Sequence, residues 1–196
     1  MRLILVRHGE TAWNEAGRYQ GWEDPPLSPR GWTTARGIAA RLRLRGVTRC
    51  ALWSSDLRRA VLTARVAMGR MPRIDARLRE LDFGAFAGRT YQENVDRFGS
   101  RFVSWVEHRG RPAPPGGEAL DDFFGRTREW LDGVRRSTSA DETVVAVTHG
   151  GVVRTLVRPF TDEEHWPGNG EITVLRWTEG RENPDIERWT RDQEEA

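Results

Sequence analysis

The chain lacks lysine, and all 31 of its basic residues are arginines. This absence excludes a nucleotide-binding phosphate loop, which requires a lysine, and any mechanism that forms a Schiff base on a lysine side chain. The 29 acidic residues leave a net charge of +2. The isoelectric point is nevertheless about 9.3, because few groups titrate between neutrality and the arginines. The charges are interspersed along the chain, so a nucleic-acid-binding surface is not favoured.

Cysteine is nearly absent, with Cys50 as the single one. It cannot form an internal disulfide and has no companion cysteines for a metal site. Cysteine phosphatases carry an arginine six positions after the nucleophile, and here that position holds Asp56. The sequence therefore excludes that class of phosphatase, and we interpret Cys50 as a small core residue.

Long apolar runs are also missing, so the sequence contains no transmembrane span and we expect no membrane partner. Met1 and Arg2 lead directly into the first apolar segment, which leaves no room for a signal peptide and favours a cytoplasmic location. The chain has 196 residues, 37% of them hydrophobic and 31% charged. We expect one globular domain over residues 1–196.

Two short motifs each follow an apolar run that is typical of a buried strand. Residues 3–6 precede the motif RHGET at 7–11, and residues 144–147 precede THGG at 148–151. In a mostly parallel sheet, strand carboxyl ends open onto the crevice where ligands bind. Two histidines and an arginine at that edge predict an anion pocket. Phosphate is the favoured anion, because the planar fork of arginine matches its oxygens.

Strands and helices alternate along most of the chain, which predicts an α/β fold: a three-layer sandwich with a mostly parallel central sheet flanked by helices. Residues 85–117 are the least regular part and predict a small cap of helices and loops, because prolines and glycines end the segment. Expected strands cover 2–6, 50–53, 73–75, 143–148, 172–177 and 186–189. The first expected helix begins at Pro29 and is capped by Ser28. Further helices are expected over 57–68, 91–98, 102–108, 118–136 and 152–157. We expect the chain end after Arg191 to be frayed.

Four motifs in this order resemble the histidine phosphatase superfamily, which has the phosphoglycerate mutase-like fold. They are RHG at 7–9, SSDLRRA at 54–60, RELDFG at 79–84 and THG at 148–150. The resemblance covers nearly the whole chain. It implies a phosphoryl-transfer enzyme that acts on a small phosphorylated metabolite and needs neither a metal nor a cofactor.

The motifs assign a role to each of five candidate catalytic residues. His8 is expected to attack phosphorus and carry the phosphoryl group, and nearby guanidinium groups keep it neutral by lowering its pKa. Arg7, Arg59 and His149 are expected to hold the three non-bridging oxygens. Loss of one such donor typically costs about 3–4 kcal/mol of transition-state stabilisation. By resemblance, Glu80 is the proton donor to the leaving group.

The resemblance also implies a set of residues around the phosphate, namely Thr11, Asn14, Gln20, Gly21 and Gly150. No carboxylate cluster suited to a metal is visible in the sequence. Oligomeric state cannot be read from the chain, although an exposed sheet edge would permit a homodimer.

Several assignments keep an alternative. Asp82 competes with Glu80 as the acid if this segment is extended, and Glu80 could instead form a surface salt bridge. Arg58 competes with Arg59, and His149 could be a buried structural histidine. The acidic segment before His165 suggests either a metal ligand or an exposed helix end.

The aromatic residues divide into two expected groups. The first fills the core: Trp32, Trp53, Trp130 and Trp177. The second lines the pocket: Trp13, Trp22 and, from the cap, Phe86, Phe102 and Trp105.

The resemblance leaves the reaction open, because the superfamily contains both phosphatases and mutases. Family mutases bind a second anionic group with an adjacent arginine pair and a lysine in the cap, and they usually place an asparagine where this chain has Gly151. The cap arginines here are isolated: Arg89, Arg97, Arg101, Arg109 and Arg111. We therefore expect a phosphomonoesterase acting on a sugar phosphate, a phosphoglycerate-like acid or ribazole phosphate. The alternatives are a cofactor-dependent phosphoglycerate mutase, a non-catalytic phosphate-binding module of the same fold, and an arginine-rich nucleic-acid binder.

Overall fold

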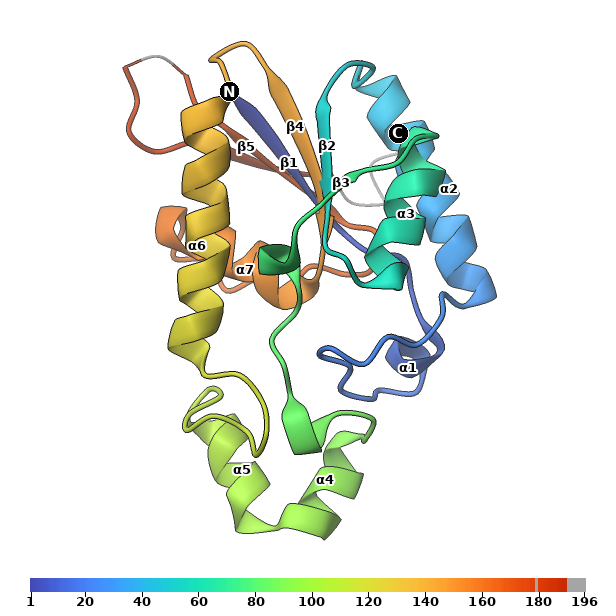
Figure 1. The fold of residues 1–196 in the computed structure, drawn as a ribbon, viewed down its shortest axis with the longest axis vertical. Helices are drawn as coiled ribbons and strands as arrows, with labels where there is room; N and C mark the ends of the chain where they lie inside the picture. Colours follow the sequence, from blue (N-terminus) through green and yellow to red (C-terminus); the bar gives the residue numbers. More distant parts are fainter. Residues whose placement is uncertain (179, 190–196) are drawn as a thin grey trace.

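The computed structural model describes residues 1–178 and 180–189, in which helices and strands alternate (Figure 1). The predicted frayed end lies outside these residues. The six strands are β1 (Arg2–Arg7), β2 (Ala51–Ser54), β3 (Arg73–Ile74), β4 (Thr143–Thr148), β5 (Ile172–Arg176) and β6 (Asp185–Trp189). The α-helices are α1 (Ala12–Glu15), α2 (Pro29–Leu44), α3 (Arg58–Met68), α4 (Tyr91–Phe98), α5 (Ser100–Glu107), α6 (Leu120–Ser137) and α7 (Gly150–Val157). The 3-10 helices are η1 (Ala76–Leu78), η2 (Gly84–Phe86) and η3 (Arg158–Phe160).

The strands form one sheet in the order β3-β2-β4-β1-β5-β6. Strands β3, β2, β4 and β1 are parallel, whereas β5 and β6 are antiparallel to their neighbours. This confirms the predicted α/β fold with a mostly parallel sheet. The parallel half brings the carboxyl ends of β1 and β4 to the same edge, where Arg7 pairs with Thr148.

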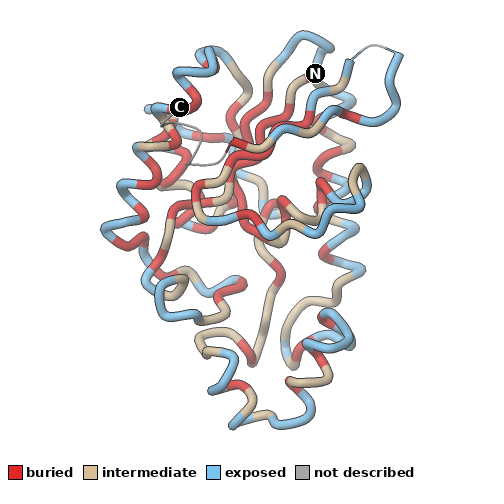
Figure 2. The backbone as a smooth tube through the Cα atoms, turned by 180° about the vertical axis from the view of Figure 1, so that it is seen from behind, coloured by how far each residue is buried: buried red, intermediate tan, exposed pale blue. Residues whose placement is uncertain are grey.

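The three layers follow from the two-residue period of the strands. Leu3 and Leu5 of β1 face α6 and α7, in a cluster that includes Trp130. Ile4 and Val6 point to the opposite side and pack with residues of α2 and α3. Figure 2 shows the central strands buried along their length while the outer faces of the helices are exposed. Among the described residues, no helix is long and apolar enough to cross a membrane.

The cap helices α4 and α5 lie beyond the sheet edge at which β1 and β4 end (Figure 1). Their aromatic residues correct one expectation, because they form a core and do not line an open pocket. Phe86, Phe102 and Trp105 are 1%, 0% and 7% exposed. Their rings pack edge-to-face or stacked on one another, and Tyr19 joins them from the loop after α1.

The helix beginnings show where the sequence pattern was sufficient. Ser28 caps α2 by accepting a hydrogen bond from the Gly31 amide, with Pro29 in the first turn, as predicted. Helix α7 begins at Gly150, two residues before the predicted start. Glycine weakens a helix, so the pattern gave no signal there. The expectation that Trp32 fills the core was wrong: it is 36% exposed on α2, whereas Trp130 is fully buried.

Candidate active site

His8 and His149 are neighbours because the strands before them are paired in register. Arg7 lies opposite Thr148 in the parallel ladder, and the His8 amide donates to the Thr148 carbonyl at 2.9 Å. The two imidazole rings lie 5.1 Å apart between centroids, in an edge-on arrangement. The side chains predicted from two separate motifs therefore meet at one point of the sheet edge.

The hydrogen bonds of His8 define which ring nitrogen is available. Its Nδ1 lies 2.7 Å from the Gly9 carbonyl, an acceptor only, so Nδ1 carries the proton. Nε2 is then the unprotonated nitrogen, and it accepts a 3.3 Å hydrogen bond from Nε of Arg59. A side chain at position 9 would collide with the Gly31 carbonyl at 2.5 Å, which explains the glycine after His8. The lone pair on Nε2 is thus directed toward the guanidinium of Arg59.

Two other residues of the site, His149 and Arg7, have buried polar atoms without a partner among the described residues. Both ring nitrogens of His149 and Nε of Arg7 are buried and have no hydrogen-bond partner within residues 1–178 and 180–189. Buried polar atoms in folded proteins are nearly always hydrogen-bonded. The one N–H of a neutral His149 ring and the Nε–H of Arg7 are therefore available to the oxygens of an anion that binds in the site.

Both imidazoles are held in the neutral form. Burial, then the charges of Arg59 and Arg7, lowers the pKa of His8 well below 6.5. Burial, then Arg59 and His8, does the same to the pKa of His149. A neutral His8 keeps the lone pair that a nucleophile requires.

This burial predicts that acid destabilises the fold before its carboxylates titrate. Below pH 6.5 the unfolded chain protonates both histidines while the folded chain does not. The free energy of unfolding therefore decreases as the pH is lowered. The expected slope is up to about 1.4 kcal/mol per pH unit for each imidazole. Urea denaturation from about pH 7 to about pH 5 measures it. His149→Gln should flatten the slope, and an unchanged slope in that variant would contradict a buried neutral His149.

Arg59 lies in the site, and Arg58 does not. The Arg59 side chain is 1% exposed, whereas Arg58 is on the surface. Nη2 of Arg59 donates to the Gly21 carbonyl at 2.7 Å, and Nη1 donates to the Glu23 carbonyl at 2.8 Å. Nη1 also pairs with Asp24 at 3.1 Å. The loop that contains Gly21 thus fixes the orientation of the guanidinium.

Asp24 is a functional candidate that sequence reasoning missed. Besides pairing with Arg59, its carboxylate accepts the backbone amides of Arg58 at 2.5 Å and Arg59 at 3.3 Å, so it caps the start of α3 from a separate loop. The helix's own cap residue, Leu57, has no side-chain hydrogen bond to offer. Nothing local in the sequence links Asp24 to α3, since the contact spans 34 residues.

We predict that Asp24→Ala lowers kcat/KM by up to about 100-fold, because a misoriented Arg59 no longer matches the phosphate. The variant also loses the cap of α3, which costs about 1 kcal/mol of stability. Steady-state kinetics and urea denaturation separate the two effects. Asp24→Asn keeps one oxygen acceptor and should recover part of kcat/KM. An Asp24→Ala enzyme with wild-type kcat/KM would show that Arg59 does not depend on this carboxylate.

Arg7 is anchored from the opposite side of the site. Its Nη1 donates to the Pro167 carbonyl at 2.6 Å, and its backbone pairs with Glu171 and Gly170. Burial lowers the pKa of Arg7, while the charges of Glu80 and Glu171 oppose this effect. An arginine remains ionised under such shifts, so Arg7 contributes a fixed positive charge.

Glu80 reaches the site through α7. Its Oε2 accepts the Gly151 amide and its Oε1 accepts the Leu81 amide, both at 3.0 Å. A side chain at position 151 would lie 2.2 Å from Oε1 of Glu80, so a larger residue there would displace this carboxylate. Asp82, the alternative acid, accepts the Gly84 amide at 2.9 Å and shapes the turn into η2. The geometry therefore favours Glu80 as the acid.

The side chains of Thr11, Asn14 and Gln20 form one network beside His8. Thr11 caps α1 together with Asn14, and its hydroxyl contacts Oε1 of Gln20 at 3.0 Å. Oδ1 of Asn14 accepts from the Thr11 amide and from Nδ2 of Asn169. The side-chain nitrogen of Asn14, Nδ2, bonds to none of the described residues, so it can donate to a ligand. Asn169, which also donates to the His8 carbonyl at 3.1 Å, is a second residue that the sequence did not suggest.

Of the remaining expected site residues, Gly150 approaches Arg7, because a Cβ there would lie 3.6 Å from the guanidinium. Trp22 lies beside Glu80, and its indole nitrogen donates to the Glu80 carbonyl at 2.9 Å. Trp13 packs against Gly88 at the cap. The structure thus brings together all five candidate catalytic residues and the five around them.

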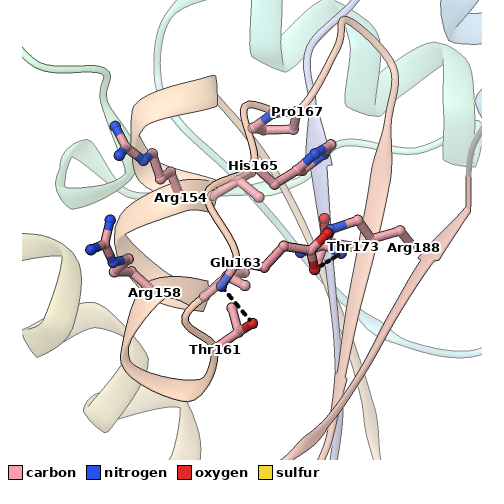
Figure 3. Close-up of a pocket in the computed structure, with 10 residues that line it drawn as sticks. Arg154, Arg158, Thr161, Glu163, His165, Pro167, Thr173 and Arg188 are labelled. Carbon is pink, nitrogen blue, oxygen red and sulfur yellow. Dashed lines mark hydrogen bonds and ion pairs between the residues drawn. The ribbon is translucent and has the colours of Figure 1, made fainter.

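A separate pocket lies between α7, the segment after η3 and strands β5 and β6 (Figure 3). No predicted site residue lines it. Its charged side chains are paired: Arg188 contacts Glu163 at 2.8 Å, and His165 contacts Glu171 at 2.5 Å. His165 is not on a helix, which corrects one expectation. The described residues contain no group of three or more potential metal ligands.

Comparison with known proteins gives consistent results. A family model described as "Histidine phosphatase superfamily (branch 1)" matches residues 3–192. Phosphoserine phosphatase 1 of Hydrogenobacter thermophilus is 35% identical over 159 residues, 80% of this chain and 74% of that protein. A 2,3-bisphosphoglycerate-dependent phosphoglycerate mutase of Xanthobacter autotrophicus is 30% identical over 162 residues, 79% and 78% of the two chains. The structure of YhfR from Bacillus stearothermophilus is 31% identical with a TM-score of 0.81, covering 94% of each chain.

Proposed function

Because the chain belongs to the histidine phosphatase superfamily, branch 1, we propose that it hydrolyses the phosphate ester of a small metabolite through a phosphohistidine on His8. One observation carries the proposal. The neutral, buried His8 has Nδ1 bound to the Gly9 carbonyl and Nε2 directed at Arg59, beside His149. Nε2 is thus the ring nitrogen with a lone pair, and it can attack phosphorus once Nε of Arg59 donates to a phosphate oxygen in its place.

In the first step, the lone pair of Nε2 attacks phosphorus and the ester P–O bond breaks. The leaving oxygen takes a proton from Glu80, which lies at the amino end of α7 within hydrogen-bond reach of Gly151. Arg7, Arg59 and His149 stabilise the three non-bridging oxygens with charge and N–H donors that are already in place. The Gly9 carbonyl holds the remaining ring proton and so supports the positive charge on phosphohistidine.

In the second step, water attacks phosphorus on the opposite side from Nε2. Glu80, now ionised, takes the proton of that water, and the P–N bond breaks to release phosphate and neutral His8. The same carboxyl group thus serves as acid and then as base. The charged groups that contact phosphate belong to the chain, so we propose that no metal ion takes part.

The cap supports hydrolysis over transfer between phosphoglycerates. A mutase must hold a second anionic group, but three of the five cap arginines contact other groups of the chain. Arg89 donates to the carbonyls of Ala85 and Ala87, and Arg111 forms a two-bond pair with Asp121. Arg109 contacts Glu164 at 3.2 Å. We therefore propose hydrolysis, the reaction named for the phosphoserine phosphatase relative. The proposed substrate class is a phosphorylated amino acid, sugar or hydroxy acid.

A panel of phosphomonoesters assayed with a chelator tests this function. The panel contains phosphoserine, phosphoglycerate, a hexose phosphate, a ribonucleoside monophosphate, ribazole phosphate and nitrophenyl phosphate. We expect phosphate release that the chelator does not reduce. Interconversion of phosphoglycerates faster than phosphate release would replace the proposal with a mutase. Phosphate binding without turnover of any ester would identify a non-catalytic module.

A further inference from the structure

Arg126 reaches from α6 to the segment that carries Glu80. Its Nη1 donates to the carbonyls of Arg77 and Arg79 at 2.8 Å each, and its Nη2 donates to the Glu80 carbonyl at 2.9 Å. Nε and Nη2 also bind the carboxylate of Glu118 at 2.6 and 2.8 Å. The side chain is only 16% exposed, so these contacts are largely shielded from water. One guanidinium thus binds three backbone carbonyls at and just before Glu80.

The segment is held from several sides, because Arg79 forms an ion pair with Asp56 and the Leu78 carbonyl accepts from the Thr148 hydroxyl at 2.7 Å. It lies between η1 and η2, outside the sheet, and runs through Arg79 in an extended conformation. Carbonyls in such a segment need partners when they are shielded from solvent. Besides Arg126, the Glu80 carbonyl receives only the indole N–H of Trp22, at 2.9 Å, within the described part of the chain. Within the described part of the chain, Arg126 is thus the side chain that joins the carbonyls of Arg77, Arg79 and Glu80 to a helix.

Helix α6 supplies that rigidity. It is 18 residues long, and Trp130, one turn after Arg126, is fully buried in the core. Glu118 extends the connection to the other side, because its amide donates to the Asp82 carbonyl at 3.0 Å. The Glu80 backbone is thus fixed between α6 and the end of the cap.

We infer that Arg126 is a positioning residue for Glu80: through the backbone carbonyls it binds, it places the Glu80 carboxylate against Gly151 and beside His8. The inference rests on the proposed function, in which Glu80 transfers the protons. The carboxylate packs closely against this helix start, since Oε2 bonds to the Gly151 amide at 3.0 Å and a Cβ at position 151 would lie 2.2 Å from Oε1. A shift of about 1 Å in a catalytic group can lower a rate about 100-fold.

Charge alone is the competing explanation. Arg126 is among the cations that lower the pKa of His149, although its contribution is the smallest of those that act on it. A lysine at position 126 keeps the positive charge but loses the planar fork that serves three carbonyls and a carboxylate. Arg126→Lys therefore separates charge from positioning.

The test is a double-mutant cycle with Glu80→Gln. We expect Arg126→Met to lower kcat for the best alkyl phosphate of the panel by about 10- to 100-fold, with KM less affected. In the Glu80→Gln background the same substitution should change kcat within about twofold, because the group it positions is already inactive. Arg126→Lys should resemble Arg126→Met.

Three controls keep the result interpretable. Arg128→Met changes an exposed arginine of the same helix that bonds to no described side chain, and it should leave kcat unchanged. Competitive inhibition by inorganic phosphate should be unchanged in Arg126→Met, which shows that the phosphate donors are intact. In a rapid-mixing experiment, Arg126→Met should slow the phosphorylation of His8 less with nitrophenyl phosphate than with the alkyl ester, because nitrophenolate leaves without a proton.

Three outcomes would overturn the inference. They are additive losses in the cycle, wild-type kcat in Arg126→Met, or recovery by Arg126→Lys, which would assign the effect to charge. If Glu80→Gln itself keeps wild-type kcat, the proposed role of Glu80 fails instead, so the two failures can be told apart.

Discussion

The His8→Ala variant should lose phosphatase activity by roughly 10⁴- to 10⁶-fold, the range seen when a catalytic nucleophile is removed. Nε2 of His8 is the buried, unprotonated nitrogen that faces Arg59, at the carboxyl end of β1. Arg7, Arg59 and His149 remain, so inorganic phosphate should still bind. Phosphate release from the best ester of the panel and calorimetric titration with phosphate measure the two quantities.

His108→Ala is the matched control for this experiment. His108 is exposed at the end of α5, and within the described residues its imidazole bonds only to Ser104. Its replacement should leave kcat and phosphate binding unchanged. Activity in His8→Ala within tenfold of the wild type would contradict covalent catalysis at this position. Loss of phosphate binding together with activity would indicate that His8 mainly shapes the pocket.

The Glu80→Gln variant should lose about 10²- to 10⁴-fold in kcat, the usual contribution of general acid–base catalysis. Glutamine fills the same space and can still accept a backbone amide, but it can neither give nor take a proton. The loss should therefore depend on the substrate. For alkyl phosphates we expect slow formation of phosphohistidine, whereas nitrophenyl phosphate should give a normal burst followed by slow hydrolysis. Rapid-mixing kinetics with both esters measures this difference.

Asp82→Asn serves as the control for Glu80. Asp82 accepts the Gly84 amide, and an asparagine can keep that bond, so kcat should change little. A larger loss in Asp82→Asn than in Glu80→Gln would reverse the assignment of the acid. An equal loss of burst amplitude with both esters would argue that Glu80 acts on phosphate binding and not on proton transfer.

The parts of the site that lie on strands could be predicted from the sequence. Buried runs of apolar residues fix β1 and β4, and their parallel pairing brings the residues that follow, His8 and His149, to one edge. Local capping signals also sufficed for α2, where Ser28 and Pro29 stand in adjacent positions. The roles of Arg59 and Glu80 depended on resemblance to a family, because neither residue stands out by periodicity or charge.

The supporting residues could not be predicted, because their contacts join segments far apart in the chain. Asp24 caps a helix 34 residues later, Asn169 contacts His8 across 161 residues, and Arg126 binds Glu80 across 46. Nothing in the sequence around each of these residues distinguishes it from a polar residue on the surface. The prediction for Trp32 was wrong for a different reason: its helix was predicted correctly, but the side chain lies on the outer face of that helix.

The most direct test of the account is to trap the phosphorylated enzyme. The protein is mixed with a radiolabelled phosphomonoester, quenched within one turnover, digested and mapped by mass spectrometry. We expect a phosphoryl group on Nε2 of His8 that is labile in acid and stable in base, and that accumulates in Glu80→Gln with nitrophenyl phosphate. Turnover without any label on His8, or label on another residue, would contradict the proposed mechanism.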